Sequence, residues 1–291
     1  RVLEFQAAVV AVALFARSTD QIFYSSELKP YVCDLAVSLG IMLLAVRLGH
    51  GRGTEWDFAG FGLLATAAPW FSFPSSFVIA GCGLALVWEC SRRGRNRELV
   101  GLLAIGGCWL ASAAGSYITS RWLLNPSTTM YLFWDFAFLP IPPASRADLV
   151  KIIGILLETF VNPLNLVPSA LPWLGVLLPL GLFVAGAFSL ARRDQTAFLC
   201  LALPILLALI AASARRYPFH GRLILYLVPA FLLILAEGTS RVRVKASARV
   251  YAVTLILLLH YPIDGAFYEA AGKHWRQYNI HGDLNDNLFM P

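Results

Sequence analysis

Long apolar runs alternate with shorter polar connections along most of the chain. Nine of these runs suggest helices that cross a bilayer, since a span needs about 20 apolar residues and fewer when it is tilted or shares polar ends. The predicted spans are Val2–Ala16, Tyr31–Leu48, Phe58–Phe71, Ser76–Cys90, Leu99–Thr119, Pro172–Ala191, Phe198–Ala212, Leu223–Gly238 and Val250–Tyr261. The pattern therefore predicts an all-α, polytopic transmembrane bundle over residues 1–261, followed by a tail of residues 262–291.

The longest connection, residues 120–171, contains a further predicted helix. Ser145 and Asp148 have the spacing of a capping box, which predicts a helix that runs to about Val161. Polar or small residues recur on one face of that helix, namely Asp148, Lys151, Gly154 and Glu158. With apolar residues on the other face, it is expected to lie in the membrane interface and cap the bundle. A tenth short span is the competing interpretation.

Composition supports the membrane class. The chain of 291 residues is 58% hydrophobic and 14% charged, against roughly 45–50% and about 25% in soluble domains. The net charge of +6 comes in short clusters between apolar runs, which argues against a nucleic-acid partner. The five cysteines lie in or beside apolar runs without a C-x-x-C pair and are interpreted as packing residues: Cys33, Cys82, Cys90, Cys108 and Cys200.

Lysine and arginine collect in four of the connections. They are Arg47 and Arg52; Arg92, Arg93, Arg95 and Arg97; Arg192 and Arg193; and Arg241, Arg243, Lys245 and Arg249. Strict alternation of nine spans places all four connections on one side, which the positive-inside rule identifies as cytoplasmic. The 120–171 connection and the tail are then expected to be extracytoplasmic.

A short basic segment, Arg215 to Arg222, separates two of the most apolar runs. The alternation places it on the extracytoplasmic side, where a short basic connection is disfavoured, so its charges need a local partner. One candidate partner is an anionic ligand. The other is a carboxylate from a neighbouring helix end, such as Asp20, Glu27 or Asp34. The pattern leaves both open, and for His220 it leaves open a role in the site or simple interfacial hydrogen bonding.

A second polar segment, Tyr24 to Asp34, is expected on the same side. Helices that begin near Pro30, Pro172 and Pro218 direct the positive ends of their dipoles to that side, and phosphate complements such an arrangement. The candidate phosphate-binding residues are Lys29, Arg215, Arg216 and Arg222, supported by Tyr24, Glu27, Tyr31, Asp34, Tyr217 and His220. An interfacial aromatic belt is the alternative for Tyr24 and Tyr31. Pairing with an arginine or direct participation are the alternatives for Asp34.

The order of these motifs resembles the GT-C superfamily of polytopic membrane glycosyltransferases, in the family 39 group that includes aminoarabinose and protein mannosyl transferases. The motifs are Tyr24-Ser25-Ser26-Glu27-Leu28-Lys29-Pro30-Tyr31 with Asp34, Ser72-Phe73-Pro74-Ser75-Ser76-Phe77-Val78, Phe138-Leu139-Pro140-Ile141-Pro142-Pro143, and Tyr217-Pro218-Phe219-His220-Gly221-Arg222 with Pro229 and Glu237-Gly238. The resemblance spans nearly the whole chain, although each motif is short.

The resemblance implies a transferase that moves a sugar from a polyprenyl-phosphate carrier to an extracytoplasmic lipid, glycan or protein acceptor. It implies that Lys29, Arg215, Arg216 and Arg222 lie near the carrier phosphate, with Tyr31 and His220 as helpers. The family's acidic residue lies in a first external loop before the part that this chain matches, so the catalytic residue is unknown and is expected upstream of Arg1. The chain is interpreted as an N-terminally truncated fragment.

The remaining expectations concern location and partners. The protein is expected to be an integral protein of the bacterial cytoplasmic membrane, surrounded by membrane lipids, with its site on the extracytoplasmic face. No cofactor is assigned, and a divalent metal stays open. The alternative functions are a polytopic lipid or solute transporter or flippase, for which we find no internal repeat, and a noncatalytic membrane subunit.

Overall fold

The computed structural model describes residues 3–25, 30–123, 132–167, 172–245 and 247–259. All regular secondary structure within these ranges is helical. The helices are α1 Phe5–Arg17, α2 Thr19–Ser25, α3 Tyr31–Gly49, α4 Glu55–Ala67, η1 Ala68–Trp70, α5 Ser75–Arg92, α6 Asn96–Leu123, η2 Asp135–Ala137, α8 Arg146–Val161, α9 Pro172–Arg193, α10 Gln195–Ser213, η3 Gly221–Leu227, α11 Val228–Lys245 and a last helix, Ala248–Leu259. The predicted tail, residues 262–291, lies outside the described residues.

Every one of the nine predicted apolar runs overlaps a helix, so the all-α prediction is confirmed. Among the described residues, five helical segments are long and apolar enough to cross a membrane: Tyr31–Gly49, Asn96–Ser120, Gly175–Arg193, Gln195–Ser213 and Gly221–Val242. The predicted span Leu223–Gly238 agrees least well with a single α-helix, because its first residues belong to the 3-10 helix η3. Pro229 has no N–H to donate to the carbonyl of Leu225, which favours an α-helix that begins at Val228.

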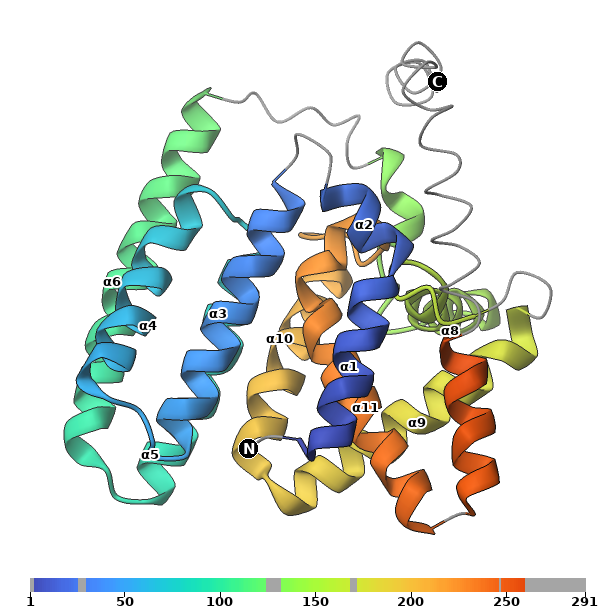
Figure 1. The fold of residues 1–291 in the computed structure, drawn as a ribbon. Coiled ribbons are helices and arrows are strands. Elements are labelled where there is room, and N and C mark those ends of the chain that lie inside the picture. The colour runs from blue at the N-terminus through green and yellow to red at the C-terminus, as the bar shows by residue number, and fades with distance from the viewer. Residues whose placement is uncertain (1–2, 26–29, 124–131, 168–171, 246, 260–291) are drawn as a thin grey trace.

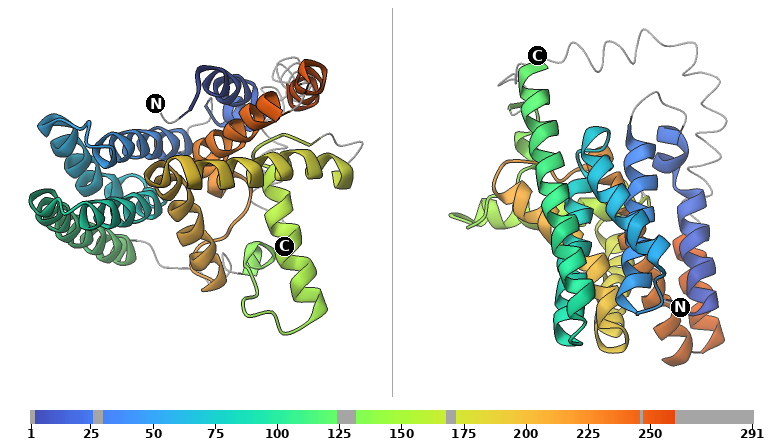
Figure 2. Two further views of the ribbon diagram at one scale, coloured as in Figure 1. Left: turned by 90° about the horizontal axis from the view of Figure 1, so that it is seen from below. Right: turned by 90° about the vertical axis from the view of Figure 1, so that its left-hand side faces the viewer.

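The helix α11 lies at the centre of the bundle (Figure 1). The most apolar window of Gly221–Val242 is 89% buried, whereas that of Asn96–Ser120 in α6 is only 6% buried. The two views of Figure 2 place α6 at the edge of the bundle. The outer surface of α6 exposes residues such as Leu103 and Leu110, which suits a surface that faces lipid.

Close contact between α9 and α11 depends on two glycines. A Cβ added at Gly186 would lie 1.8 Å from the carbonyl oxygen of Ile234, and one added at Gly238 would lie 2.0 Å from that of Leu182. The backbones of the two helices therefore touch directly, as small residues permit in membrane bundles. A glycine also permits close packing of α5 against α10, where a Cβ at Gly81 would lie 2.5 Å from the nitrogen of Pro204.

The helix α8 lies across the bundle rather than along it. It is seen nearly end-on in Figure 1, where α3, α4 and α6 run up the page. Its predicted capping box is confirmed: the Ser145 hydroxyl accepts a hydrogen bond from the Asp148 N–H at 3.1 Å, and the Asp148 carboxylate accepts one from the Ser145 N–H at 2.9 Å. Its crosswise orientation favours the predicted interfacial helix over the competing interpretation of a tenth short span.

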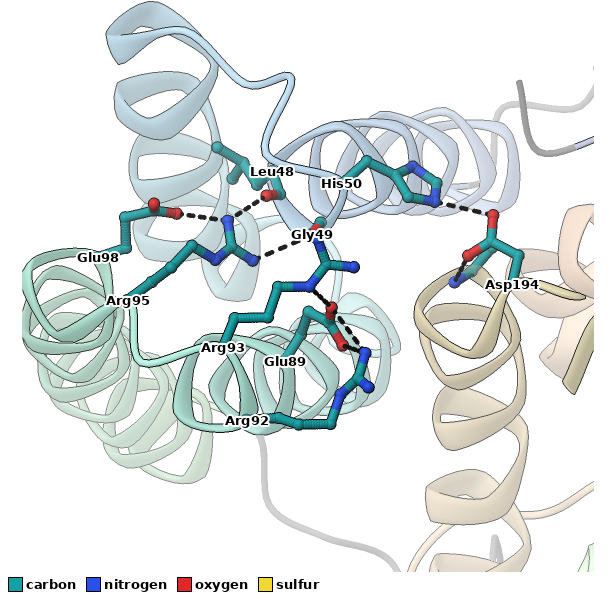
Figure 3. Close-up of polar contacts among 10 residues, drawn as sticks. Leu48, Gly49, His50, Glu89, Arg92, Arg93, Arg95, Glu98 and Asp194 are labelled. Carbon is teal, nitrogen blue, oxygen red and sulfur yellow. Dashed lines mark hydrogen bonds and ion pairs between the residues drawn. The ribbon is translucent and has the colours of Figure 1, made fainter. Parts of the chain in front are cut away.

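The four basic connections meet at one end of the molecule, which we call the basic end. Arg95 donates hydrogen bonds to the carbonyl oxygens of Leu48 and Gly49 at 3.1 and 3.0 Å, and His50 Nε2 lies 2.8 Å from Asp194 Oδ2 (Figure 3). These contacts join the connections α3–α4, α5–α6 and α9–α10. The shared side that the alternation of spans predicts for these three connections is confirmed.

The end of α11 also belongs to the basic end. Glu237 is fully buried in α11 and accepts hydrogen bonds from Arg193 in α9 at 2.8 Å and from Arg241 at 3.0 Å. The hydroxyl of Ser189 donates a third, at 2.6 Å. The fourth basic cluster thus lies beside the other three, and its charges neutralise a buried carboxylate.

All five cysteines are free thiols. Cys82, Cys90 and Cys200 are buried, as the packing interpretation requires, and the Cys82 thiol donates to the Cys200 carbonyl at 3.5 Å. Cys33 and Cys108 are exposed, so that interpretation is wrong for these two.

Candidate functional site

Residues 214–222, which contain the basic segment, link α10 to η3 and include the first two residues of η3. They are folded against the rest of the bundle at the end opposite to the basic end. Arg215 has a φ of +54° and Gly221 a φ of +47°, so the chain turns through the left-handed region at two points. Phe219 is 1% exposed, and its N–H donates to the Ala137 carbonyl at 3.0 Å. These contacts hold the basic segment against residues 133–139.

Arg215 is paired with a carboxylate. Its guanidinium forms an ion pair with Asp135 and lies 5.5 Å from the centre of the Phe138 ring. Lys151 Nζ, from α8, donates to the carbonyl oxygen of Asp135 at 2.9 Å and lies 4.0 Å from its carboxylate. A carboxylate partner was one of the two predicted alternatives, and for Arg215 that partner is Asp135, which was not among the residues named as examples. Of those examples, Glu27 lies outside the described residues.

Arg222 and Arg216 have different surroundings. The guanidinium of Arg222 is half-buried and lies 5.9 Å from the centre of the Trp134 ring, within reach of a cation–π interaction. Arg216 is exposed. Neither arginine has a carboxylate partner in the part of the chain that the structure describes. Both remain able to donate hydrogen bonds to an anion.

His220 lies among aromatic rings beside Arg222. The centre of its ring is 5.0 Å from that of Phe136 and 6.4 Å from that of Trp134. Burial lowers the pKa of His220 below its ordinary value of 6.5. The imidazole is therefore neutral at physiological pH and can accept a proton.

A cavity of about 380 Å³ lies between α8, α9 and the basic segment, and Phe136, Lys151, Glu158 and His220 contribute to its wall. Burial raises the pKa of Glu158 above its ordinary value of 4.5. No hydrogen bond or ion pair to its carboxylate occurs among the described residues. A cavity that brings together two groups with shifted pKa values and a cation is typical of a ligand or reaction site.

The start of α3 approaches the basic segment through Tyr217. The rings of Tyr24 and Tyr31 have centres 5.2 Å apart, and the Tyr217 hydroxyl donates to the Leu223 carbonyl at 2.7 Å. The pKa of Tyr217 is raised, chiefly by burial and further by Asp34 and Tyr31. Four of the predicted residues thus lie close together: Tyr24, Tyr31, Asp34 and Tyr217. No arginine pairs with Asp34 among the described residues.

The predicted residues therefore fall into two groups rather than around one centre. Arg215, His220 and Arg222 contact residues 134–138, whereas Tyr217 lies with the start of α3. Lys29 and Glu27 lie outside the described residues, so the predicted approach of Lys29 to the arginines stays a prediction. Within the described ranges, no group of three or more His, Cys, Asp or Glu side chains is arranged to hold a metal.

Sequence reasoning missed three residues of this site: Trp134, Asp135 and Glu158. Each had a signal. The run Phe133-Trp134-Asp135-Phe136 is too aromatic to be fully solvated, and Glu158 falls on the polar face of α8. Neither signal says that the two segments meet at residues 215–222. Comparison with protein-family models, curated proteins and solved structures found no match to the chain.

Proposed function

We propose that the protein is a GT-C-like membrane glycosyltransferase that takes a sugar from a polyprenyl-phosphate carrier and transfers it to an extracytoplasmic acceptor. In this proposal nine helices cross a bacterial cytoplasmic membrane. The basic end faces the cytoplasm, and the end with residues 214–222 faces outward. The shorter helices α1, α4, α5 and Ala248–Leu259 then cross at a tilt or where neighbours supply polar cover.

The observation that carries the proposal is Arg222, which has no carboxylate partner among the described residues. It lies against the Trp134 ring, as does His220, and His220 lines the cavity together with Glu158. Arg216, six residues before Arg222, is exposed and likewise has no carboxylate partner in the described part of the chain. Asp135 already pairs with Arg215 and contacts Lys151. An unpaired arginine near the end of an apolar bundle favours an anionic ligand. Phosphate matches the planar donor fork of a guanidinium.

In the proposed reaction, arginines stabilise the leaving phosphate and a residue of the cavity wall acts as the base. The acceptor's hydroxyl oxygen forms a bond to the anomeric carbon of the sugar as the bond from that carbon to the phosphate oxygen breaks. The bonding electrons leave with the phosphate, whose negative charge grows, and contacts from Arg222 and Arg216 strengthen with it. The acceptor's proton passes to a base, for which Glu158 and His220 are the candidates.

Binding of polyprenyl phosphate tests the proposal. The full chain in nanodiscs is offered polyprenyl phosphate or the corresponding polyprenyl alcohol, and retention is measured by native mass spectrometry. We expect selective retention of the phosphate. Arg222→Ala should weaken it by about 10- to 100-fold, the equivalent of roughly 1.5–3 kcal/mol for a hydrogen bond to a charged group.

Arg146→Ala is the matched control, because it removes one positive charge at the exposed start of α8 without touching the cavity. Its retention of the phosphate should equal that of the wild type. Equal retention of phosphate and alcohol, or equal loss in both variants, contradicts the assignment of Arg222. In a transfer assay, Arg222→Ala should abolish sugar transfer while membrane insertion is unchanged.

One observation favours a transporter as the second candidate. Asp34 is 5% exposed within the candidate span Tyr31–Gly49, and buried acidic groups in spans often mark ion pathways. A transporter would move its lipid or solute across the vesicle without breaking the sugar–phosphate bond. Release of free polyprenyl phosphate from a sugar-loaded carrier therefore separates the two functions.

A further inference from the structure

A buried polar cluster lies between α3 and η3, apart from the cavity described above. It contains Asp34 and Ser38 of α3, Ser72 from the connection before α5, and Tyr226 of η3. Asp34 is 5% exposed, Ser38 is fully buried, and Ser72 and Tyr226 are each 1% exposed. Such groups are expected to find hydrogen-bond partners when water is excluded.

Three atoms of this cluster have no hydrogen-bond partner in the part of the chain that the structure describes. They are Asp34 Oδ1, Ser38 Oγ and the Tyr226 hydroxyl oxygen. A buried polar atom without a partner typically costs about 1–3 kcal/mol, and more when it is charged. The three atoms belong to two helices that pack against each other, α3 and η3, so one ligand between these helices could satisfy all of them.

The side chains are positioned to converge. Asp34 and Ser38 are four residues apart in α3, so they lie on the same face of the helix, and α3 packs against η3. The Tyr226 hydroxyl lies within electrostatic range of Asp34. Ser72 positions the carboxylate, because its hydroxyl is hydrogen-bonded to Asp34 and accepts the Ser75 N–H at 3.3 Å.

Among the described residues, which do not include Lys29, no cationic side chain balances the charge of Asp34. The titratable groups near it are Tyr31, Tyr217 and Tyr226, and no lysine, arginine or histidine forms an ion pair with it among the described residues. An unpaired carboxylate in an apolar bundle is stable only if it gains a proton or a cation.

We propose that Asp34, Ser38 and Tyr226 bind a monovalent cation of the Na⁺ class between α3 and η3. The oxygen-only donor set is the one that hard cations prefer, and a single carboxylate balances one positive charge. One cation would meet both needs at once, whereas protonation of Asp34 removes only the charge and needs a separate water molecule to supply partners for Ser38 Oγ and the Tyr226 hydroxyl. The proposal does not depend on the glycosyltransferase assignment.

Cation-dependent thermal stability tests the proposal. The full chain in nanodiscs of zwitterionic lipid is titrated with NaCl, with choline chloride holding the ionic strength constant, and unfolding is followed by intrinsic fluorescence. We expect a saturable rise in Tm with Na⁺, because a ligand that binds only the folded state stabilises it. Asp34→Asn should remove the rise, and Glu55→Gln, a change at an exposed carboxylate, should retain it.

If Asp34→Asn does not fold, Ser38→Ala and Tyr226→Phe test the same site. Each removes one proposed ligand atom and should shift the half-maximal Na⁺ concentration upward several-fold. The proposal is overturned if Na⁺ and choline act alike on the wild type, which would leave a proton or a water molecule at the cluster. It is also overturned if the folded variants respond to Na⁺ as the wild type does.

Discussion

The two acidic residues of α8 show how one helix can hold carboxylates in opposite environments. The Asp148 carboxylate accepts N–H groups of Ala144 and Ser145 in the capping box, which lowers its pKa. Glu158, ten residues further on, faces the cavity and has its pKa raised by burial. The fold therefore favours the ionised form of the first and disfavours that of the second. Unfavourable burial of a charge is typical of a site kept for function rather than stability.

This contrast predicts opposite effects of neutral replacements. Glu158→Gln should raise Tm at neutral pH, since the folded state no longer holds a desolvated carboxylate. A raised pKa contributes stability below the ordinary value of 4.5 and loses it as pH rises through the folded-state pKa. The advantage of the variant should therefore shrink as pH falls toward that value. Thermal unfolding of both proteins in nanodiscs, from acidic to neutral pH, measures this difference in Tm.

Asp148→Asn is the counterpart on the same helix. Its lowered pKa contributes stability above the ordinary value of 3.8 and loses it as pH falls. The variant should therefore have a lower Tm than the wild type at neutral pH, with the deficit closing in acid. If both variants changed Tm in the same direction at neutral pH, the assigned environments of the two carboxylates would be wrong.

Between elements, direct backbone contact of α9 with α11 governs the geometry of the bundle. The contact runs from Gly186 to Gly238 and continues at the basic end through Arg193 and Glu237. Since α11 follows the basic segment through η3, and α9 follows α8, this packing also sets the distance between the two sides of the cavity.

Replacement of a single glycine tests that packing. Gly186→Ala places a Cβ against the Ile234 carbonyl, so the helices must separate. Overpacking costs roughly 1–3 kcal/mol, and we expect the upper part of that range, because backbone atoms cannot rotate away as a side chain can. Thermal unfolding and the yield of monodisperse protein are the measurements.

Gly181→Ala is the control within α9. A Cβ there meets nothing within 4 Å, and alanine favours a helix over glycine by roughly 0.5–1 kcal/mol, so Tm should be unchanged or slightly higher. Equal loss of stability in the two variants would mean that Gly186 is required for a reason other than contact with α11.

For the whole molecule, charge is distributed by end. The connections with the most arginine meet at the basic end. The helix α8 lies across the bundle, roughly perpendicular to α3, α4 and α6. By the positive-inside rule, we expect this distribution to orient the protein in a bilayer with its basic end toward the cytoplasm, as the proposed topology has it.

Cysteine labelling in intact cells tests the orientation. In a background with Cys33 and Cys108 replaced by serine, Ala144→Cys, at an exposed position before α8, should react with a membrane-impermeant maleimide added outside. Arg97→Cys, exposed at the basic end, should react only after permeabilisation. The reverse pattern would invert the topology and place residues 214–222 in the cytoplasm.

The positions of the helices depend on short stretches of sequence, so they could be predicted from the sequence alone. Apolar runs such as Tyr31–Leu48 predicted helices because an apolar segment in lipid must satisfy its backbone internally. Ser145 and Asp148 marked the start of α8 because a capping box needs residues only three positions apart. Alternation of spans even predicted that the arginine clusters share one end, since each crossing reverses the side.

Contacts between distant segments were decided only by the tertiary structure. Arg215 pairs with Asp135, 80 residues away, whereas sequence proximity to helix ends suggested Asp20, Glu27 or Asp34. Periodicity placed Glu158 on the polar face of α8 but could not say that this face covers a cavity. The clustering of Asp34 with Tyr226 likewise depends on how α3 packs against η3. Local pattern sets which residues are helical and which face is polar; three-dimensional packing sets which charges meet.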